Sequence, residues 1–106
     1  MAVRVNAETF AAEVLQAEGL VLVDFYSDSC VPCKRIAPLL SEVAAADPDG
    51  LKVVKVNINF DAELAEQYAV QAAPTLVFFQ NGAEVACLRG LVKKAELTEV
   101  IDSLKK

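Results

Sequence analysis

Three short apolar runs, separated by helical patterns, restrict the folds open to this chain more than any other feature. The runs cover residues 20–26, 51–57 and 75–79, and Val, Leu and Phe dominate them. Continuous apolar runs of this length are typical of strands that are covered on both faces. Because such strands need helices on either side, we expect a three-layer α/β domain.

Apolar residues at helical spacing predict the covering helices. Four segments share this spacing: 7–18, 31–46, a short helix that starts near Asn59, and 94–105. Asn6 is a suitable cap for the first helix, because its side chain can accept hydrogen bonds from free amides. In the short helix we expect Phe60, Leu64 and Tyr68 to face the core.

A turn signal near the C-terminus adds an antiparallel strand. Asn81-Gly82 is the strongest short hairpin signal, because both turn positions need a positive φ. Residues 84–89 are then the returning strand, and residues 3–5 alternate as a short edge strand. We therefore expect one domain over residues 1–106, with a mixed five-stranded sheet flanked by four helices.

The overall charge excludes several classes of partner. Lys and Arg total 10 and Asp and Glu total 15, which gives a net charge of −5. An acidic chain lacks the electrostatic footprint for nucleic acid or an anionic membrane surface. No apolar run is long enough to span a membrane, and the N-terminus does not resemble a secretory signal. We therefore expect a cytoplasmic protein and a monomer.

The chain has no histidine and three cysteines. The missing histidine removes Ser–His and Cys–His catalytic pairs and mixed Cys/His zinc sites. Lasting structural disulfides are rare in the cytoplasm, so a close cysteine pair there is more often catalytic or metal-binding than structural.

Cys30 and Cys33 lie where the strand 20–26 passes into the helix 31–46. At a helix N-terminus the free amides and the helix dipole favour a thiolate. Lys34 and Arg35 add positive charge nearby, while Asp28 opposes them. A thiol of low pKa with a second thiol three residues on can attack a disulfide and then be released by its neighbour.

Several segments together resemble the thioredoxin family. Residues 24–34, which read Asp-Phe-Tyr-Ser-Asp-Ser-Cys-Val-Pro-Cys-Lys, resemble its active-site segment. Ala73-Pro74-Thr75 resembles its cis-proline loop, and Gly82 and Gly90 fall where the family keeps glycines. The combination is specific, whereas a lone C-x-x-C pair is not.

This resemblance implies a protein dithiol–disulfide oxidoreductase that reduces disulfides in substrate proteins. Cys30 would be the exposed nucleophile that forms a mixed disulfide, and the more buried Cys33 would resolve it. The redox-active disulfide Cys30–Cys33 would serve without a bound cofactor or metal. A thioredoxin reductase would be the electron donor.

The resemblance also implies a substrate-binding surface around the pair. Pro32 restricts Val31 and holds the cysteines at the helix start. Pro74, cis in the family, would lie against the pair, and the backbone of Ala73 would pair with the substrate chain. Further members of this surface would be Val31, Gly90 and Leu91, with Ala72 beside them.

Asp24 is a carboxylate inside an apolar strand. Burial disfavours its charged form, so we expect a raised pKa, which suits proton transfer to or from Cys33. By resemblance to the family, Lys55 on the neighbouring strand would modulate this acid. A solvent-exposed Asp24 at a strand end, and a Lys55 that only extends its ammonium group to water, are the structural alternatives.

The sequence departs from the family pattern beside the first cysteine. Ser29 stands where the family usually has Trp, Val31 where it has Gly, and Tyr26 where it often has Trp. These changes leave substrate preference and reduction potential open, but they remove no group that the exchange reaction requires.

Other functions remain possible at this point. The pair could belong to a disulfide oxidase or isomerase, to a binding module without turnover, or to half of a metal site. Cys87, the only other cysteine, is interpreted as a packing residue on an edge strand. A regulatory or dimer-forming role for Cys87 would need an exposed thiol.

Overall fold

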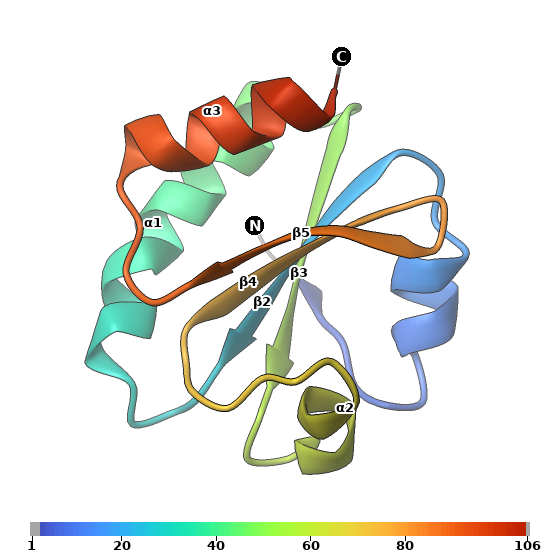
Figure 1. Cartoon of the computed structure of the whole chain (residues 1–106), viewed down its shortest axis with the longest axis vertical. Helices are drawn as coiled ribbons and strands as arrows, with labels where there is room; N and C mark the ends of the chain where they lie inside the picture. Colours follow the sequence, from blue (N-terminus) through green and yellow to red (C-terminus); the bar gives the residue numbers. More distant parts are fainter. Residues whose placement is uncertain (1–2, 106) are drawn as a thin grey trace.

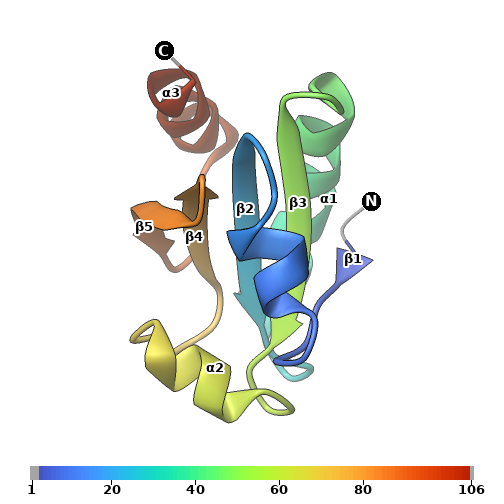
Figure 2. The ribbon, with the colours of Figure 1, turned by 90° about the vertical axis from the view of Figure 1, so that its right-hand side faces the viewer.

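A computed structural model describes residues 3–105 and contains the expected mixed sheet. Its strand order is β1-β3-β2-β4-β5, with β1, β3 and β2 parallel and with β4 and β5 antiparallel to their neighbours. Figure 1 shows the whole chain, and Figure 2 shows the five strands side by side. The strands are β1 Val3–Arg4, β2 Leu20–Tyr26, β3 Leu51–Asn57, β4 Thr75–Gln80 and β5 Ala83–Arg89. The prediction of a five-stranded α/β sheet is therefore confirmed.

Helices cover both faces of this sheet. They are the π-helix η1 Ala11–Leu15 and the α-helices α1 Val31–Ala46, α2 Ala62–Gln67 and α3 Lys94–Leu104. Figure 2 shows η1 in front of β2 and β3, with α1 behind them. No helix within residues 3–105 is long and apolar enough to cross a membrane.

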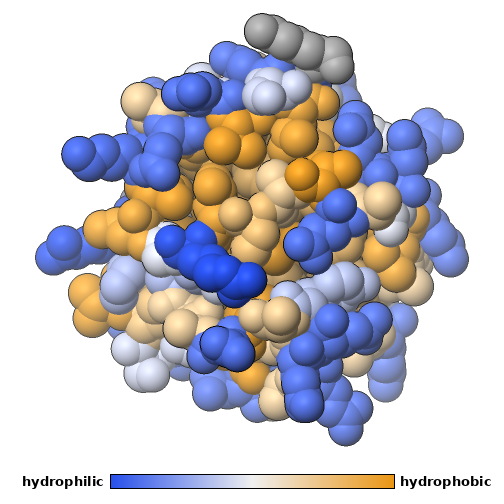
Figure 3. All heavy atoms as spheres, viewed as in Figure 1, coloured by the Kyte–Doolittle hydropathy of each residue, from blue (hydrophilic) through white to orange (hydrophobic). Residues whose placement is uncertain are grey.

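Two hydrophobic clusters lie on opposite faces of the sheet. Neighbouring strand residues alternate between them: Phe79 belongs to the cluster under η1 and α2, and Phe78 to the cluster under α1 and α3. Both rings are almost completely buried. Partly buried side chains of β5 and α3 pack against the second cluster. Figure 3 shows hydrophobic atoms at the surface between these two elements. The sheet is thus the shared wall of two cores.

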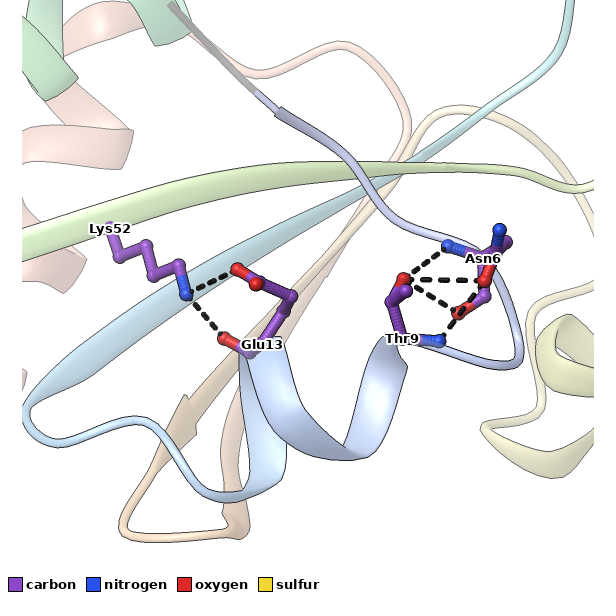
Figure 4. A network of polar contacts seen from close by, with 4 residues as sticks. All are labelled: Asn6, Thr9, Glu13 and Lys52. Carbon is purple, nitrogen blue, oxygen red and sulfur yellow. Dashed lines mark hydrogen bonds and ion pairs between the residues drawn. The ribbon is translucent and has the colours of Figure 1, made fainter.

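The first helix is shorter and wider than predicted. Residues 7–9 form a turn, Phe10 is helical as the cap, and η1 itself covers only Ala11–Leu15, with the Gln16 amide donating to the Ala11 carbonyl at 2.8 Å. The helix N-cap is Phe10 and not Asn6 as predicted; the Asn6 Oδ1 accepts from the amides of Glu8 and Thr9 at 2.9 and 3.0 Å in the preceding turn, and Figure 4 shows its contacts with Thr9. These local hydrogen bonds satisfy the amides before a regular helix begins.

A lysine of β3 holds the end of η1. The Nζ of Lys52 donates to the carbonyl oxygen and to Oε2 of Glu13, both at 2.8 Å (Figure 4). Gly82 in the β4–β5 turn also lies close to η1. A Cβ added at Gly82 would come within 2.9 Å of the Leu15 carbonyl oxygen. The turn itself is as predicted, with φ of 53° at Asn81 and 84° at Gly82.

The helix expected to start near Asn59 begins later, because the preceding residues form a turn. The side chain of Asn57 accepts from the amides of Asn59 at 2.9 Å and Phe60 at 3.4 Å, and α2 starts at Ala62. Leu64 faces the core as expected, but the prediction for Phe60 was wrong: its side chain is 75% exposed.

Candidate active site

Three strand ends meet at one edge of the sheet. Phe25 of β2 lies beside Thr75 of β4, and Thr75 lies beside Arg89 of β5. The segments 27–33, 72–74 and 90–91 therefore leave the sheet at the same edge. The Gly90 amide donates to the Pro74 carbonyl at 2.9 Å, which joins two of these segments directly.

The two cysteines form a disulfide at the start of α1. Cys30 is the N-cap and Cys33 lies in the first turn, with their Cα atoms 5.2 Å apart. The Cys33 amide donates a hydrogen bond to Cys30 Sγ at 3.1 Å. Pro32 occupies a first-turn position, where the missing N–H costs no helical hydrogen bond. A negative charge on Cys30 Sγ would be stabilised by the hydrogen bond from this amide and by the positive end of the helix dipole.

The expected difference in exposure between the cysteines is not found. Cys30 is 8% exposed and Cys33 is 5% exposed, so the expectation of an exposed Cys30 was wrong for the disulfide form. In the disulfide form both cysteines are therefore buried, with Cys33 only slightly less exposed than Cys30.

Asp24 is buried as expected, and only 6% of it is exposed. Desolvation by burial raises the pKa of its carboxyl from 3.8 to about 6, and the positive charge of Lys55 opposes this rise. Its Oδ1 has no hydrogen-bond partner among residues 3–105. Asp24 and Cys33 line the same hollow of about 210 Å³. The exposed strand-end alternative for Asp24 is therefore excluded.

Lys55 lies beside Asp24 in the register of β3 and β2. It forms no salt bridge with Asp24, although its charge lowers the pKa of that carboxyl. Its Nζ lies 5.4 Å from the ring centre of Tyr26, and its side chain is half-buried. Lys55 therefore acts on Asp24 across a distance rather than through direct contact.

The Ala73–Pro74 peptide bond is cis, as the family resemblance implied. Pro74 is buried and Ala73 is half-buried, while Ala72 is exposed. The Thr75 hydroxyl donates to the Ala72 carbonyl at 2.7 Å and holds this loop against the start of β4.

Two large apolar side chains at this edge face solvent. Val31 is 60% exposed and Leu91 is 54% exposed. Gly90, between β5 and Leu91, has a φ of 83°, a conformation that favours glycine. Large exposed apolar side chains next to a reactive group are typical of contact surfaces.

The sequence interpretation missed Asn57. It is 1% exposed, and its Nδ2 donates to both oxygens of Asp28 at 3.2 Å while its Oδ1 holds the turn after β3. This side chain therefore links the loop that precedes Cys30 to the β3–α2 connection. The available signal was a polar residue at the end of an otherwise apolar run.

Cys87 is half-buried on β5 and packs against the cluster under η1 and α2, which agrees with its interpretation as a packing residue. Within residues 3–105, no group of three or more Cys, Asp or Glu side chains is arranged to hold a metal ion.

The family model described as Thioredoxin matches residues 1–103 of the chain. This chain belongs to the thioredoxin family. It is 41% identical over 99 residues to the thioredoxin of Acidithiobacillus ferridurans, which covers 93% of this chain and 92% of that protein. It is 39% identical over 102 residues to thioredoxin 1 of Synechococcus elongatus, with 96% and 95% covered. It is 40% identical over 101 residues to the thioredoxin of Pseudomonas aeruginosa, with 95% and 94% covered.

Membership of the thioredoxin family decides what the cysteine pair does. The chain is a thioredoxin-type disulfide oxidoreductase with protein-disulfide reductase activity, and Cys30–Cys33 is its redox-active disulfide. Thioredoxins need no bound cofactor, so the two sulfur atoms carry the electrons themselves.

Proposed function

We propose that residues 1–106 act as one thioredoxin domain and that Cys30 is the attacking thiol. The observation that carries this assignment is the hydrogen bond from the Cys33 amide to Cys30 Sγ at the N-terminus of α1. In the reduced protein this donor and the helix dipole stabilise a thiolate on Cys30 rather than on Cys33.

The proposed exchange has two steps. The Cys30 thiolate attacks one sulfur of a substrate disulfide, forms a mixed disulfide and releases the other substrate sulfur as a thiolate. Cys33 then loses its proton and attacks Cys30 Sγ, which releases the second substrate sulfur and forms the Cys30–Cys33 disulfide. The substrate gains the two electrons that the cysteine pair loses.

Asp24 is the proposed proton acceptor for Cys33. Both residues line one hollow, and burial raises the pKa of the Asp24 carboxyl to about 6. A base with a pKa near neutrality is both ionised at pH 7 and able to hold a proton. Lys55 modulates Asp24, because its positive charge favours the ionised carboxyl.

The substrate chain is proposed to bind over the edge where the three segments meet. Val31 and Leu91 supply exposed apolar contacts, and Ala73 offers its backbone as a short added strand. Pro74 and Gly90 shape the loops that carry these contacts, through the hydrogen bond between them. Pro32 keeps the cysteine pair at the helix start.

Regeneration needs an external reductant. We assign this role to a thioredoxin reductase, as the family implies, and protein disulfides are the substrates. The protein is proposed to work as a monomer in the cytoplasm and to bind no nucleic acid.

Trapping tests the roles of the two thiols. Reduced Cys33→Ser should form a stable mixed disulfide with insulin, seen by mass spectrometry, because Cys30 attacks and nothing resolves the intermediate. Cys30→Ser should form none, and Cys87→Ser should turn over like the unmodified protein. Trapping through Cys33 in the Cys30→Ser variant would contradict the assignment.

A further inference from the structure

Asp28 places a carboxylate close to the proposed attacking thiol. It comes two residues before Cys30 in the sequence, and the Cys30 amide donates to the Ser27 carbonyl at 3.4 Å, so the chain turns back on itself here. A negative charge close to a thiol disfavours the thiolate form. The direction in which the Asp28 side chain points therefore matters for the reactivity of Cys30.

The buried side chain of Asn57 holds this carboxylate. Its Nδ2 donates to both oxygens of Asp28 at 3.2 Å. Asn57 is 1% exposed, and its Oδ1 accepts the amides of Asn59 and Phe60, so its own side chain is fixed. Asp28 is exposed and forms no salt bridge within residues 3–105. The side-chain amide of Asn57 therefore sets where the charge of Asp28 lies.

The held carboxylate lies in surroundings that compensate its charge. Asp28 lines the hollow of about 210 Å³ that Cys33 also lines and Cys30 does not. The charged residues that line this hollow are Asp24, Asp28, Lys34 and Lys55. Two positive charges thus balance two negative ones. Arg35, the next residue of α1, is exposed and adds a further positive charge at this end of the helix.

Without Asn57, the carboxylate of Asp28 would have other donors within its reach. In the first turn of α1, the Val31 amide donates to no carbonyl of residues 3–105, and the Cys33 amide donates to Cys30 Sγ. Free amides and the positive end of a helix dipole attract a carboxylate as they attract a thiolate. A released Asp28 would therefore compete for the groups that stabilise a negative charge on Cys30.

We propose that Asn57 is a positioning residue for the attacking thiol: by binding both oxygens of Asp28, it keeps this carboxylate from the N-terminus of α1 and so favours the thiolate of Cys30. The inference rests on the proposed function, in which Cys30 attacks. It adds a residue of β3 that acts on Cys30 only through Asp28, since Asn57 forms no hydrogen bond with either sulfur.

The pH dependence of alkylation tests this role. In the full chain with Cys33→Ser and Cys87→Ser, Cys30 is the only thiol, and the midpoint of its rate of reaction with iodoacetamide against pH gives its pKa. In this background, Asn57→Ser keeps an oxygen that can accept the amides of the turn but loses the donor to Asp28. Far-ultraviolet circular dichroism establishes that each variant is folded.

Asn57→Ser should raise the midpoint by about half a pH unit, because a like charge gains access to the thiolate. Asn57→Ala, which also loses the acceptor for the turn, should give the same shift. In an Asp28→Asn background, Asn57→Ser should leave the midpoint unchanged, because the carboxylate is gone. Asn59→Ala is the matched control at an exposed neighbouring position, and it should not move the midpoint.

A midpoint that neither Asn57→Ser nor Asn57→Ala raises would overturn the role of Asn57. A rise that persists in the Asp28→Asn background would also overturn it, because the effect would then not pass through the carboxylate. Both results leave the proposed function intact if the midpoint with Asn57 present lies below that of free cysteine. A midpoint equal to that of free cysteine would contradict the stabilised Cys30 thiolate, and with it the proposed function.

Discussion

At the scale of single residues, Asp24 shows how position changes chemistry. The same carboxyl on an exposed turn would stay ionised well below neutral pH, whereas burial in β2 raises its pKa to about 6. An unsatisfied buried carboxyl costs free energy of folding, and the fold retains it beside Cys33. This combination of cost and location is typical of groups that serve a reaction.

The pKa of Asp24 predicts how stability depends on pH. Its value rises from 3.8 to about 6 on folding, so between these values the folded state binds more protons than the unfolded state. The protonated Asp24 therefore favours the folded state at low pH, and this contribution is lost as pH rises through about 6. Above that pH the free-energy cost of burying the ionised carboxyl stays constant. Asp24→Asn should raise the free energy of unfolding of the oxidised protein by about 3 kcal/mol at pH 8 and by less than about 1 kcal/mol at pH 4.

Urea unfolding at several pH values measures this difference. Asp49→Asn is the control, because Asp49 is exposed and lies in the turn after α1. A stabilisation by Asp24→Asn that is the same at every pH would show that the ionised carboxyl is not its cause.

At the scale of elements, the long elements could be predicted from hydrophobic pattern and the short ones could not. The bounds of β2, β3 and α1 agree with the predictions. The two strands are buried on both faces and give continuous apolar runs, and the helix buries one broad face and gives a regular apolar spacing. The shapes of η1 and the turn before α2 depend on side chain–backbone hydrogen bonds of Asn6 and Asn57, which hydrophobic pattern does not encode.

The same reason explains what could be predicted of the site. Cys30, Cys33 and Asp24 stand out by type and spacing within the strand–helix junction. The cover over Cys30, the engagement of Asp28 and the exposure of Phe60 depend on which groups meet in three dimensions.

Asn57 should matter for the whole edge of the sheet that carries the disulfide. Asn57→Ala leaves the Asp28 carboxylate and the amides of Asn59 and Phe60 without their buried partner. We expect a loss of about 2 kcal/mol in the free energy of unfolding. Asn59→Ala is the matched control, since Asn59 is exposed, and it should cost much less. Equal losses would contradict the role of the Asn57 side chain.

The β4–β5 turn separates two effects of glycine. Gly82→Ala forces a Cβ toward the Leu15 carbonyl at 2.9 Å and keeps a positive φ. Gly19→Ala also keeps a positive φ but meets nothing within 4 Å. Gly19→Ala should cost about 1 kcal/mol from backbone strain, and Gly82→Ala should cost more, as measured by thermal unfolding. A smaller loss for Gly82→Ala would show that η1 yields to the methyl group.

At the scale of the whole molecule, one sheet joins two cores. Phe78 and Phe79 are neighbours in sequence and pack on opposite faces of the sheet. Neither core can therefore unfold without disturbing the sheet that both cores share. A small domain of this kind is expected to unfold in one cooperative transition.

Tyrosine fluorescence tests this cooperativity. In a Tyr26→Phe background Tyr68 is the one tyrosine left, and the chain has no Trp to mask it; Tyr68 lies 5.2 Å from Phe79 by ring centres and so reports on one core. Phe78→Leu, on the other face, should lower the free energy of unfolding by about 1.5 kcal/mol and shift the fluorescence and far-ultraviolet circular dichroism transitions together. Transitions that separate would mean that the two faces unfold independently.

The buried carboxyl of Asp24 in β2 also allows proton uptake and release by this chain to be measured with little interference from other groups. Without histidine, and with both active-site sulfurs bonded to each other, the oxidised chain has few groups that exchange protons around pH 6. A potentiometric titration of the disulfide form should therefore resolve Asp24 as a step of its own near its pKa of about 6. The same titration after reduction would then show directly how many protons accompany each pair of electrons.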